Sequence, residues 1–280
     1  MTISPFARTR VVDRFTGRIL GVGSRSGVRI VVGRWDESPL GAFADVMLAD
    51  ASGTRWLLAP SEEVADYVAQ TYHFDRVVIA PMTVQEGGRG ASWRVRAGAL
   101  DTGPGDDGAL LGQALASGLD VQLTLGQRSG LGLLLRCVPR RLATSRLMAT
   151  LADPIARLTQ PGVRTRGTAG NGRREYYGAT DQHLVTGVDG TWQGADLGGI
   201  APVDPAPDFG FSSTPRVPSC VSVTTTVTRP IRPTGDGRRD DSPVSPPAAA
   251  TVRLALVGVA TLGILLVARR FVMRRRRRVG

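Results

Sequence analysis

Apolar and polar residues alternate with a period of two in several segments of the first 228 residues. Between Trp93 and Ala99 the apolar positions are separated mostly by arginines, and between Leu119 and Leu125 they are separated by Asp, Gln and Thr. Other strand-like segments cover residues 28–32, 43–48, 56–58, 76–80 and 219–227. Such alternation predicts antiparallel strands with one face in the core and the other in solvent.

Two turn sequences favour hairpins between these strands. Asn171-Gly172 lies between two strand-like segments, and Asp189-Gly190 lies just before Trp192. Asn-Gly and Asp-Gly fit the tight turns that join antiparallel strands, because these residues accept a positive φ. We therefore expect one hairpin turn at each place.

A first helix is expected to begin after Ser61. A serine at this position can accept a hydrogen bond from the first helical turn, and Glu62 and Glu63 follow it at the positive end of the helix dipole. Val64 and Val68 then fall on one face, which predicts a short helix that packs on the sheet.

A second helical region is expected between Leu131 and Leu158, with a break at Pro139 and a new start at Asp153 as N-cap, followed by Pro154. Its apolar stripe consists of Leu147, Leu151, Ile155 and Leu158. We expect the stripe to pack on the sheet, although the arginines around it also fit a basic helix that lies on lipid. The predicted fold class is α+β, with a mainly antiparallel curved sheet and two helical segments.

The chain ends in an apolar run followed by arginines. Fifteen uncharged and mostly aliphatic residues, 254–268, come directly before the arginine cluster. A helix over residues 248–268 is long enough to cross a hydrocarbon core of about 30 Å, at about 1.5 Å per residue. We therefore expect a C-terminal transmembrane helix. Its anchor residues are Leu254, Leu256, Leu262, Ile264, Leu265 and Leu266, and its lipid headgroup contacts are Arg269, Arg270, Arg274, Arg275 and Arg276.

The predicted organisation has four parts. Residues 1–228 form the α+β domain, residues 229–247 a disordered linker rich in Pro, Gly and Arg, residues 248–268 the transmembrane helix, and residues 269–280 an arginine-rich tail. The linker is assigned because it has no apolar periodicity.

The net charge of +11 is concentrated near the C-terminus. Residues 1–228 contain 23 Arg against 21 Asp and Glu, whereas residues 229–280 contain 12 Arg against 3 Asp. A nucleic-acid-binding domain usually carries its excess positive charge on the fold itself. The distribution therefore favours membrane lipid as the partner of the tail and disfavours nucleic acid.

All 35 basic residues are arginine. Without a lysine the chain is not a Schiff-base enzyme, does not attach pyridoxal phosphate, and has no phosphate-binding loop that ends in Gly-Lys. Two cysteines, Cys137 and Cys220, are too few for a disulfide-rich scaffold or a four-cysteine zinc site. We predict no cofactor.

The first residues contain no apolar segment of the kind found in secretory signals, so we expect the main domain in the cytoplasm and a single pass through the cell membrane. The positive-inside rule instead places the arginine cluster in the cytoplasm. An apolar tail that lies along the cytoplasmic leaflet satisfies both, and the orientation stays open.

The loop Gly126 to Gly132 is a candidate anion site. It follows a predicted strand and precedes a helical segment, so its amide groups would face an anion with help from Arg128, Ser129 and Gly130. The alternative is an ordinary connecting loop.

The chain has two histidines, and each has an aspartate two residues away. His73 with Asp75 and His183 with Asp181 would each lie on one face of a strand. If the two pairs met, they would supply four nitrogen and oxygen ligands for zinc, iron or manganese. The alternative is that both pairs are structural or solvated.

Glu175 lies among several arginines just after the Asn-Gly turn. We expect a solvated hairpin face with cross-strand charge pairs, with an anion-binding rim as the alternative.

The segments RWDESPLGAFADVML, PGVRTRGTAGNGRREYYGATD and FGFSSTPRVPS resemble an actinobacterial family to which no activity is assigned, and this resemblance spans most of residues 29–227. The six residues from Ser38 to Phe43 are also similar to a motif of the acetoacetate-decarboxylase-like fold. That resemblance implies a curved antiparallel sheet around a ligand cavity. It implies no decarboxylase activity, because the catalytic lysine of that family is missing.

These observations lead to two functional hypotheses. The first is a single-pass membrane-anchored protein that binds a small molecule or a protein partner. The second is a lysine-independent enzyme that uses a His/Asp acid-base or metal site in a cavity of the sheet. The sequence leaves open whether the chain is an enzyme.

Overall fold

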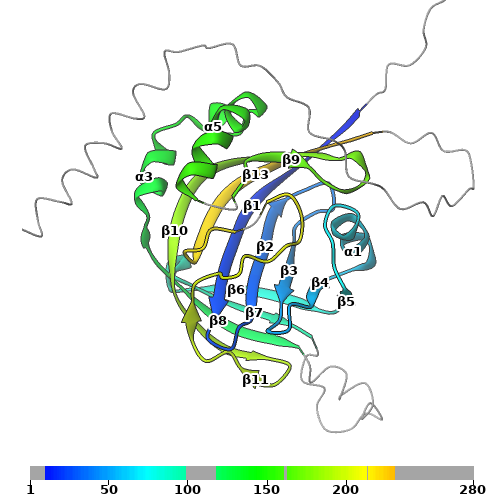
Figure 1. Ribbon diagram of the computed structural model, residues 1–280, viewed down its shortest axis with the longest axis vertical. Helices are drawn as coiled ribbons and strands as arrows, with labels where there is room; N and C mark the ends of the chain where they lie inside the picture. The colour runs from blue at the N-terminus through cyan, green and yellow to red at the C-terminus, as the bar shows by residue number, and fades with distance from the viewer. Residues whose placement is uncertain (1–9, 99–117, 161–162, 213, 231–280) are drawn as a thin grey trace, which may run out of the picture. The chain divides into compact units, whose positions relative to one another are not determined.

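The computed structural model describes residues 10–98, 118–160, 163–212 and 214–230. These residues form a 13-stranded sheet whose main path runs β5-β4-β3-β2-β1-β13-β10-β8-β7-β6 (Figure 1). The strands are β1 (Arg10–Ser24), β2 (Arg29–Glu37), β3 (Phe43–Ala49), β4 (Arg55–Ala59), β5 (Arg76–Ile79), β6 (Met82–Gly87), β7 (Ser92–Ala97), β8 (Leu119–Arg128), β9 (Arg166–Thr168), β10 (Arg174–Trp192), β11 (Ala195–Asp196), β12 (Ile200–Ala201) and β13 (Ser219–Pro230). The helices are α1 (Glu62–Ala69), α3 (Gly130–Arg136), α4 (Arg140–Ala143) and α5 (Arg146–Thr159), with 3-10 turns η1 (Gly88–Gly90) and η2 (Gly170–Gly172).

The sheet is strongly curled, and its last strands fold back over its first ones, so that β6 lies against β3. The predicted alternation holds in β7, where Trp93, Val95 and Ala97 are buried and Arg94 and Arg96 are exposed. Apolar side chains of β1 to β4 meet those of β7, β8 and β10 in one central cluster. We call the sheet face that carries this cluster the inner face. The predicted α+β fold with a curved, mainly antiparallel sheet is confirmed.

The opposite, outer face of the first strands is covered by α1. Ser61 caps this helix as predicted, because its hydroxyl accepts a hydrogen bond from the Val64 N–H at 3.3 Å. Val64 and Val68 are buried against Leu57 of β4. The helix connects β4 to β5, and these two strands are parallel, which is a departure from the predicted antiparallel pairing.

The Asn171-Gly172 hairpin is confirmed. Both residues have positive φ, 56° and 68°, and they join the antiparallel strands β9 and β10. The turn predicted at Asp189-Gly190 is wrong, because β10 continues through both residues to Trp192. Gly190 is instead required where β8 comes close, since a Cβ there would lie 2.1 Å from the Asp120 carbonyl oxygen.

The region predicted as one interrupted helix contains three helices, α3, α4 and α5. The longest, α5, begins at Ser145, whose side chain accepts a hydrogen bond from the Met148 N–H at 3.2 Å. Asp153 is therefore not the N-cap; it lies inside α5 with Pro154, is buried, and accepts a hydrogen bond from the Thr165 N–H.

The predicted packing of the apolar stripe on the sheet is also wrong at the two positions where side chains are described. Leu147 and Leu151 are 66% and 55% exposed. The contact with the sheet is made by smaller residues, so the apolar stripe of α5 does not mark its buried side.

The transmembrane helix predicted at 248–268, its anchor residues and the arginine-rich tail lie outside the described residues, as does most of the predicted linker. Within the described ranges, which stop at Pro230, no helix is both long and apolar enough to cross a bilayer.

Candidate functional site

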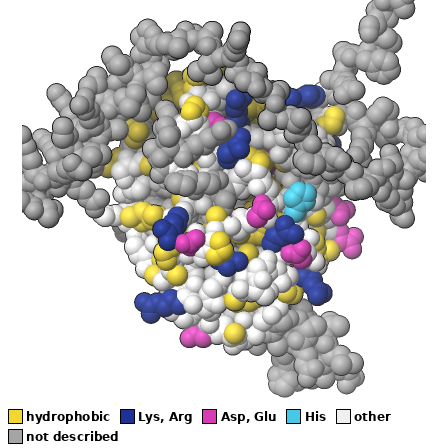
Figure 2. Space-filling view, in the orientation of Figure 1, with side chains coloured by type: hydrophobic (Ala, Val, Ile, Leu, Met, Phe, Trp, Pro, Cys, Tyr) yellow, Lys and Arg dark blue, Asp and Glu magenta, His cyan; other side chains and the backbone are white. Residues whose placement is uncertain are grey.

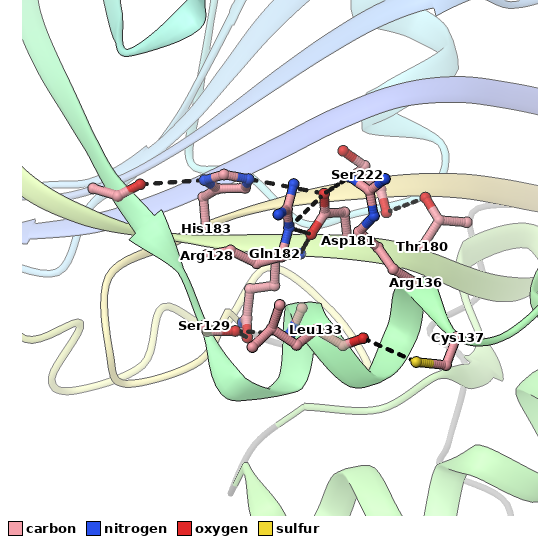
Figure 3. Close-up of polar contacts among 12 residues, drawn as sticks. Arg128, Ser129, Leu133, Arg136, Cys137, Thr180, Asp181, Gln182, His183 and Ser222 are labelled. Atoms are coloured by element: carbon pink, nitrogen blue, oxygen red, sulfur yellow. Dashed lines mark hydrogen bonds and ion pairs between the residues drawn. The ribbon is translucent and has the colours of Figure 1, made fainter.

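Two of the sequence-predicted sites meet in the structure. Arg128, the last residue of β8, and Ser129 after it lie beside the segment of β10 that contains Asp181 and His183 (Figure 3). The pairing of β8 with β10 brings these residues together, because His183 lies opposite Arg128 in the register. This arrangement is the candidate site.

Asp181 is at the centre of the candidate site. The Arg128 Nε donates to both of its carboxylate oxygens, at 2.8 and 3.1 Å. The Gln182 N–H donates to Oδ1 at 2.8 Å, and an Arg136 nitrogen from α3 lies 3.9 Å from Oδ2. The His183 Nε2 is 3.8 Å from Oδ2, while its Nδ1 is 3.2 Å from the Gly126 carbonyl oxygen. These contacts fix both the carboxylate and the imidazole.

The charge of Asp181 is stabilised at neutral pH. Partial burial acts to raise the pKa of this carboxyl group, but the hydrogen bonds from Arg128 and Gln182 and the positive charge of Arg128 outweigh it and lower the pKa. Asp181 therefore acts as an ionised partner that holds the arginine and the histidine, and it is poorly suited to be a proton donor.

The groups predicted to bind an anion already have partners. Arg128 is held by Asp181, and the Ser129 hydroxyl donates to the Gln182 side chain at 2.7 Å while it caps α3 through the Gly132 N–H at 2.9 Å. Gly130 is the first residue of that seven-residue helix. The loop is thus locked to β10, and its role as an anion site stays a prediction.

The polar residues continue across the inner face in one row. In the strand register, Asp181 lies opposite Ser222, Ser222 opposite Arg18, and Arg18 opposite Arg34. Glu86 of β6 reaches this row and accepts hydrogen bonds from both Arg18, at 2.6 Å, and Arg34. The side chains of the row are about one-fifth to one-third exposed. We call these residues, with Arg128, the arginine row.

Charges of opposite sign are also mixed on the face shown in Figure 2, where arginine and acidic side chains lie next to one another.

Cys220 lies opposite His183 in the register, which suggests a Cys-His pair at first sight. The thiol is buried, however, and burial raises its pKa to about 12. It therefore stays protonated at neutral pH and is not a nucleophile, since the thiolate is the reactive form.

His73 and Asp75 lie elsewhere in the fold. Asp75 pairs with Arg55 at 2.9 Å, and hydrogen bonds from Arg55 lower its pKa to about 2. His73 is exposed and lines a cavity of about 400 Å³ together with Thr71, Thr168, Ala169, Gly170, Asp208, Gly210 and Phe211. Throughout the ranges described by the structure, no three His, Cys, Asp or Glu side chains are grouped closely enough to hold a metal ion. The four predicted ligands are thus not brought together.

A buried polar cluster under α1 was missed by sequence reasoning. Glu175 is 2% exposed, and its Oε2 accepts hydrogen bonds from the Tyr72 and Tyr177 hydroxyls, both at 2.9 Å. Arg173, also buried, donates to the Tyr67 carbonyl and to the Thr71 hydroxyl. The solvated hairpin face expected here is wrong for Glu175 and Arg173, because Tyr67 of α1 contacts Arg173 and Tyr72, after the helix, contacts Glu175. Phe211 stacks on the neighbouring Tyr177. The arginine-rich sequence gave no signal of these contacts.

No family model matches this chain, and no curated protein matches it. Among solved structures, it is similar to a crystal structure of a protein described as a "putative AttH" from Nitrosomonas europaea, with 12% sequence identity and a TM-score of 0.23. The match covers 80% of this chain and 53% of that protein, so this chain spans about half of its length. The resemblance to an actinobacterial family stays a prediction.

Proposed function

We propose that this chain is a binding protein that its C-terminal segment anchors to the cell membrane, with the curled-sheet domain on the cytoplasmic side. The observation that carries the proposal is the apolar run 254–268, which stops directly at Arg269 and the arginines after it. Aliphatic side chains in such a run favour hydrocarbon over water, and guanidinium groups beside it pair with lipid phosphates.

A binding role is favoured over catalysis by the state of the reactive groups. The core of the curled sheet is filled by side chains such as Trp93, which is fully buried. Cys220 is buried and protonated, and Asp181 is committed to Arg128. His73 is exposed. A catalytic centre usually combines a pocket with an available acid, base or nucleophile. Cys220 and Asp181 lack that combination, and the cavity that His73 lines is outside the core of the sheet.

The arginine row indicates the class of ligand. Arg18 and Arg34 share Glu86, Arg34 also contacts Asp36, and Arg128 and Arg136 share Asp181. Four guanidinium groups thus contact three carboxylates directly. Partly exposed guanidinium groups recognise carboxylates and phosphates through paired hydrogen bonds. We therefore propose a small molecule with an anionic group as the ligand.

Flotation with neutral vesicles tests the anchor. Full-length protein is expected to float with phosphatidylcholine vesicles, whereas a chain that ends at Pro233 is expected to stay at the bottom of the gradient, because insertion of the apolar run needs no lipid charge. The double variant Leu262→Asp/Leu266→Asp should behave like the shortened chain. Equal behaviour of the full-length and shortened chains would contradict the anchor.

One observation favours the enzyme hypothesis as a second candidate. The contact of His183 Nδ1 with the Gly126 carbonyl orients the ring and leaves Nε2 beside Asp181 and near solvent. A histidine held in this way resembles a positioned acid or base. A catalytic activity of the purified protein that is lost in His183→Ala, with the melting temperature unchanged, would favour this second candidate.

A further inference from the structure

The three helices α3, α4 and α5 pack on β10 through small residues. A Cβ on Gly132 of α3 would lie 2.2 Å from the Gln182 carbonyl oxygen, and a Cβ on Gly178 of β10 would lie 2.7 Å from the Ala143 carbonyl oxygen of α4. Ala149 of α5 is buried as well, and its carbonyl accepts the Thr165 hydroxyl. These helices lie beside β10 in Figure 1. Because small residues form the contact with the sheet, several of the long apolar side chains of the three helices are left exposed to solvent.

Those long side chains are mainly leucine. Six of the ten large apolar side chains that are exposed in the described ranges belong to this one region, although it contains only about thirty residues. They are Leu131, Leu133, Leu134, Leu142, Leu147 and Leu151. Single exposed apolar residues are normal, but a concentration of this kind marks an interaction surface.

The charged residues of the same region are almost all positive. Arg136, Arg140, Arg141 and Arg146 are exposed, and Asp153, the acidic residue of these helices, is 3% exposed. Arg136 also lies 3.9 Å from Asp181 and Arg146 lies 5.7 Å from the Tyr176 ring, so Arg140 and Arg141 are the arginines that the test changes. The surface formed by the six leucines and these four arginines is called the leucine-arginine face below. It combines apolar and cationic groups without an exposed carboxylate.

We propose that the leucine-arginine face is a second membrane-binding site, which lies on a bilayer surface that contains anionic lipid. The leucines enter the boundary between headgroups and acyl chains, and the arginines pair with lipid phosphates. This is the composition of helices that lie in a membrane interface. The site deepens the proposed function by naming anionic phospholipid as the partner of the domain itself, but it acts independently of the C-terminal anchor.

The positive charge of the leucine-arginine face favours anionic lipid over two other occupants, the C-terminal segment of this chain and a second copy of it. The C-terminal segment from Arg229 onward carries 12 Arg and 3 Asp, so its docking would bring positive charge to an already positive surface. A second copy in a symmetric dimer would place these arginines near their own counterparts. An anionic bilayer satisfies the leucines and the arginines together.

The test uses a chain that ends at Pro233, because residues up to Pro233 form a compact unit by themselves. This chain is expected to co-sediment with vesicles of phosphatidylcholine containing about one-third phosphatidylserine, and to bind less in high salt. Leu147→Asp/Leu151→Asp should weaken binding at least about tenfold, since two leucines lose their burial in lipid. Arg140→Glu/Arg141→Glu should weaken binding to anionic vesicles by a similar factor.

The matched control is Val77→Asp/Ile79→Asp on the edge strand β5, where two exposed apolar residues, at 47% and 49%, receive the same change. It should bind as the parent chain does. All variants should melt near the parent temperature, because the changed side chains are exposed.

The proposal is overturned if the parent chain stays in the supernatant with anionic vesicles. It is also overturned if Leu147→Asp/Leu151→Asp binds vesicles as well as the parent chain does. A parent chain that forms dimers without binding vesicles, and loses the dimers in this variant, would overturn it too. None of these results depends on the anchor, which is tested with neutral vesicles and the full-length chain, so the two proposals can fail separately.

Discussion

Trp93→Ala is expected to lower the free energy of unfolding by about 4 kcal/mol, which is a large part of the stability of a typical domain. Trp93 is fully buried where β7 and β8 fold over β1, and the Arg18 guanidinium lies 5.3 Å from the centre of its ring. Removing the indole leaves a cavity that neighbouring strands cannot fill, because they are fixed by the hydrogen bonds of the sheet. Denaturant unfolding of the parent and the variant measures the difference.

Two controls accompany this measurement. Trp93→Phe keeps most of the apolar volume and removes the indole N–H, which is buried without a hydrogen-bond partner among the described residues. It should cost less than half as much as Trp93→Ala. Val77→Ala on the exposed edge should change stability by less than about 0.5 kcal/mol. A loss below about 1 kcal/mol for Trp93→Ala would contradict a filled core and would favour an open ligand cavity in the sheet.

The protein is expected to become less stable as the pH rises from about 5 to 8. Burial raises the pKa of Glu175 to about 7, although hydrogen bonds from Tyr72 and Tyr177 and the charge of Arg173 oppose this. Burial also raises the pKa of Asp45 to about 7, against a hydrogen bond from the Trp35 indole. Both carboxyl groups therefore keep their protons in the native state at a pH where the unfolded chain has released them.

The sign follows from proton binding. Between about pH 4.5 and 7 the native state holds more protons than the unfolded state, so the free energy of unfolding falls as the pH rises through this window. Each of Glu175 and Asp45 contributes on the order of 3 kcal/mol to this fall, at about 1.4 kcal/mol per pKa unit. Unfolding by urea at a series of pH values measures it.

Substitutions separate the contributions. Glu175→Gln and Asp45→Asn should each remove roughly half of the slope between pH 5 and 8, because an amide does not titrate. Asp75→Asn is the control, since hydrogen bonds from Arg55 lower the pKa of Asp75 to about 2 and its contribution is lost only as the pH falls below about 4. A stability that rises steadily from pH 5 to 8 would show that these two carboxyl groups are not buried as described.

The strands were predictable because alternation along a strand directly reports its buried face. The pattern of Trp93, Arg94 and Val95 is an example, since the burial of each side chain follows the sequence. The curl of the sheet was expected from a faint resemblance, but its filled interior was not. Whether the interior of the curled sheet is filled depends on which strands pack against one another, and a single sequence does not specify that packing.

Failures of the sequence reasoning share one physical cause, which is tertiary packing. Gly190 looked like a turn residue, but it is glycine because β8 approaches the backbone of β10 at that point. The leucine stripe of α5 looked buried, but Ala149 makes the contact with the fold and the leucines face outward. Glu175 looked solvated, but it is buried under Tyr72 and Tyr177, whose hydroxyls donate to it.

At the candidate site, both halves were identifiable from the sequence. Arg128 and Ser129 were singled out as a loop and Asp181 and His183 as a strand pair, but only the register of β8 against β10 joins them. The spacing of His73 and Asp75 looked the same as that of the second pair, and nothing local in the sequence distinguishes the two.

Fractionation of cells that express the full-length chain tests the membrane placement most directly. After lysis and high-speed centrifugation, the protein should be in the membrane pellet, and it should stay there after an alkaline carbonate wash, which removes proteins that are held only by charge. Recovery of the intact protein in the first supernatant would contradict the account.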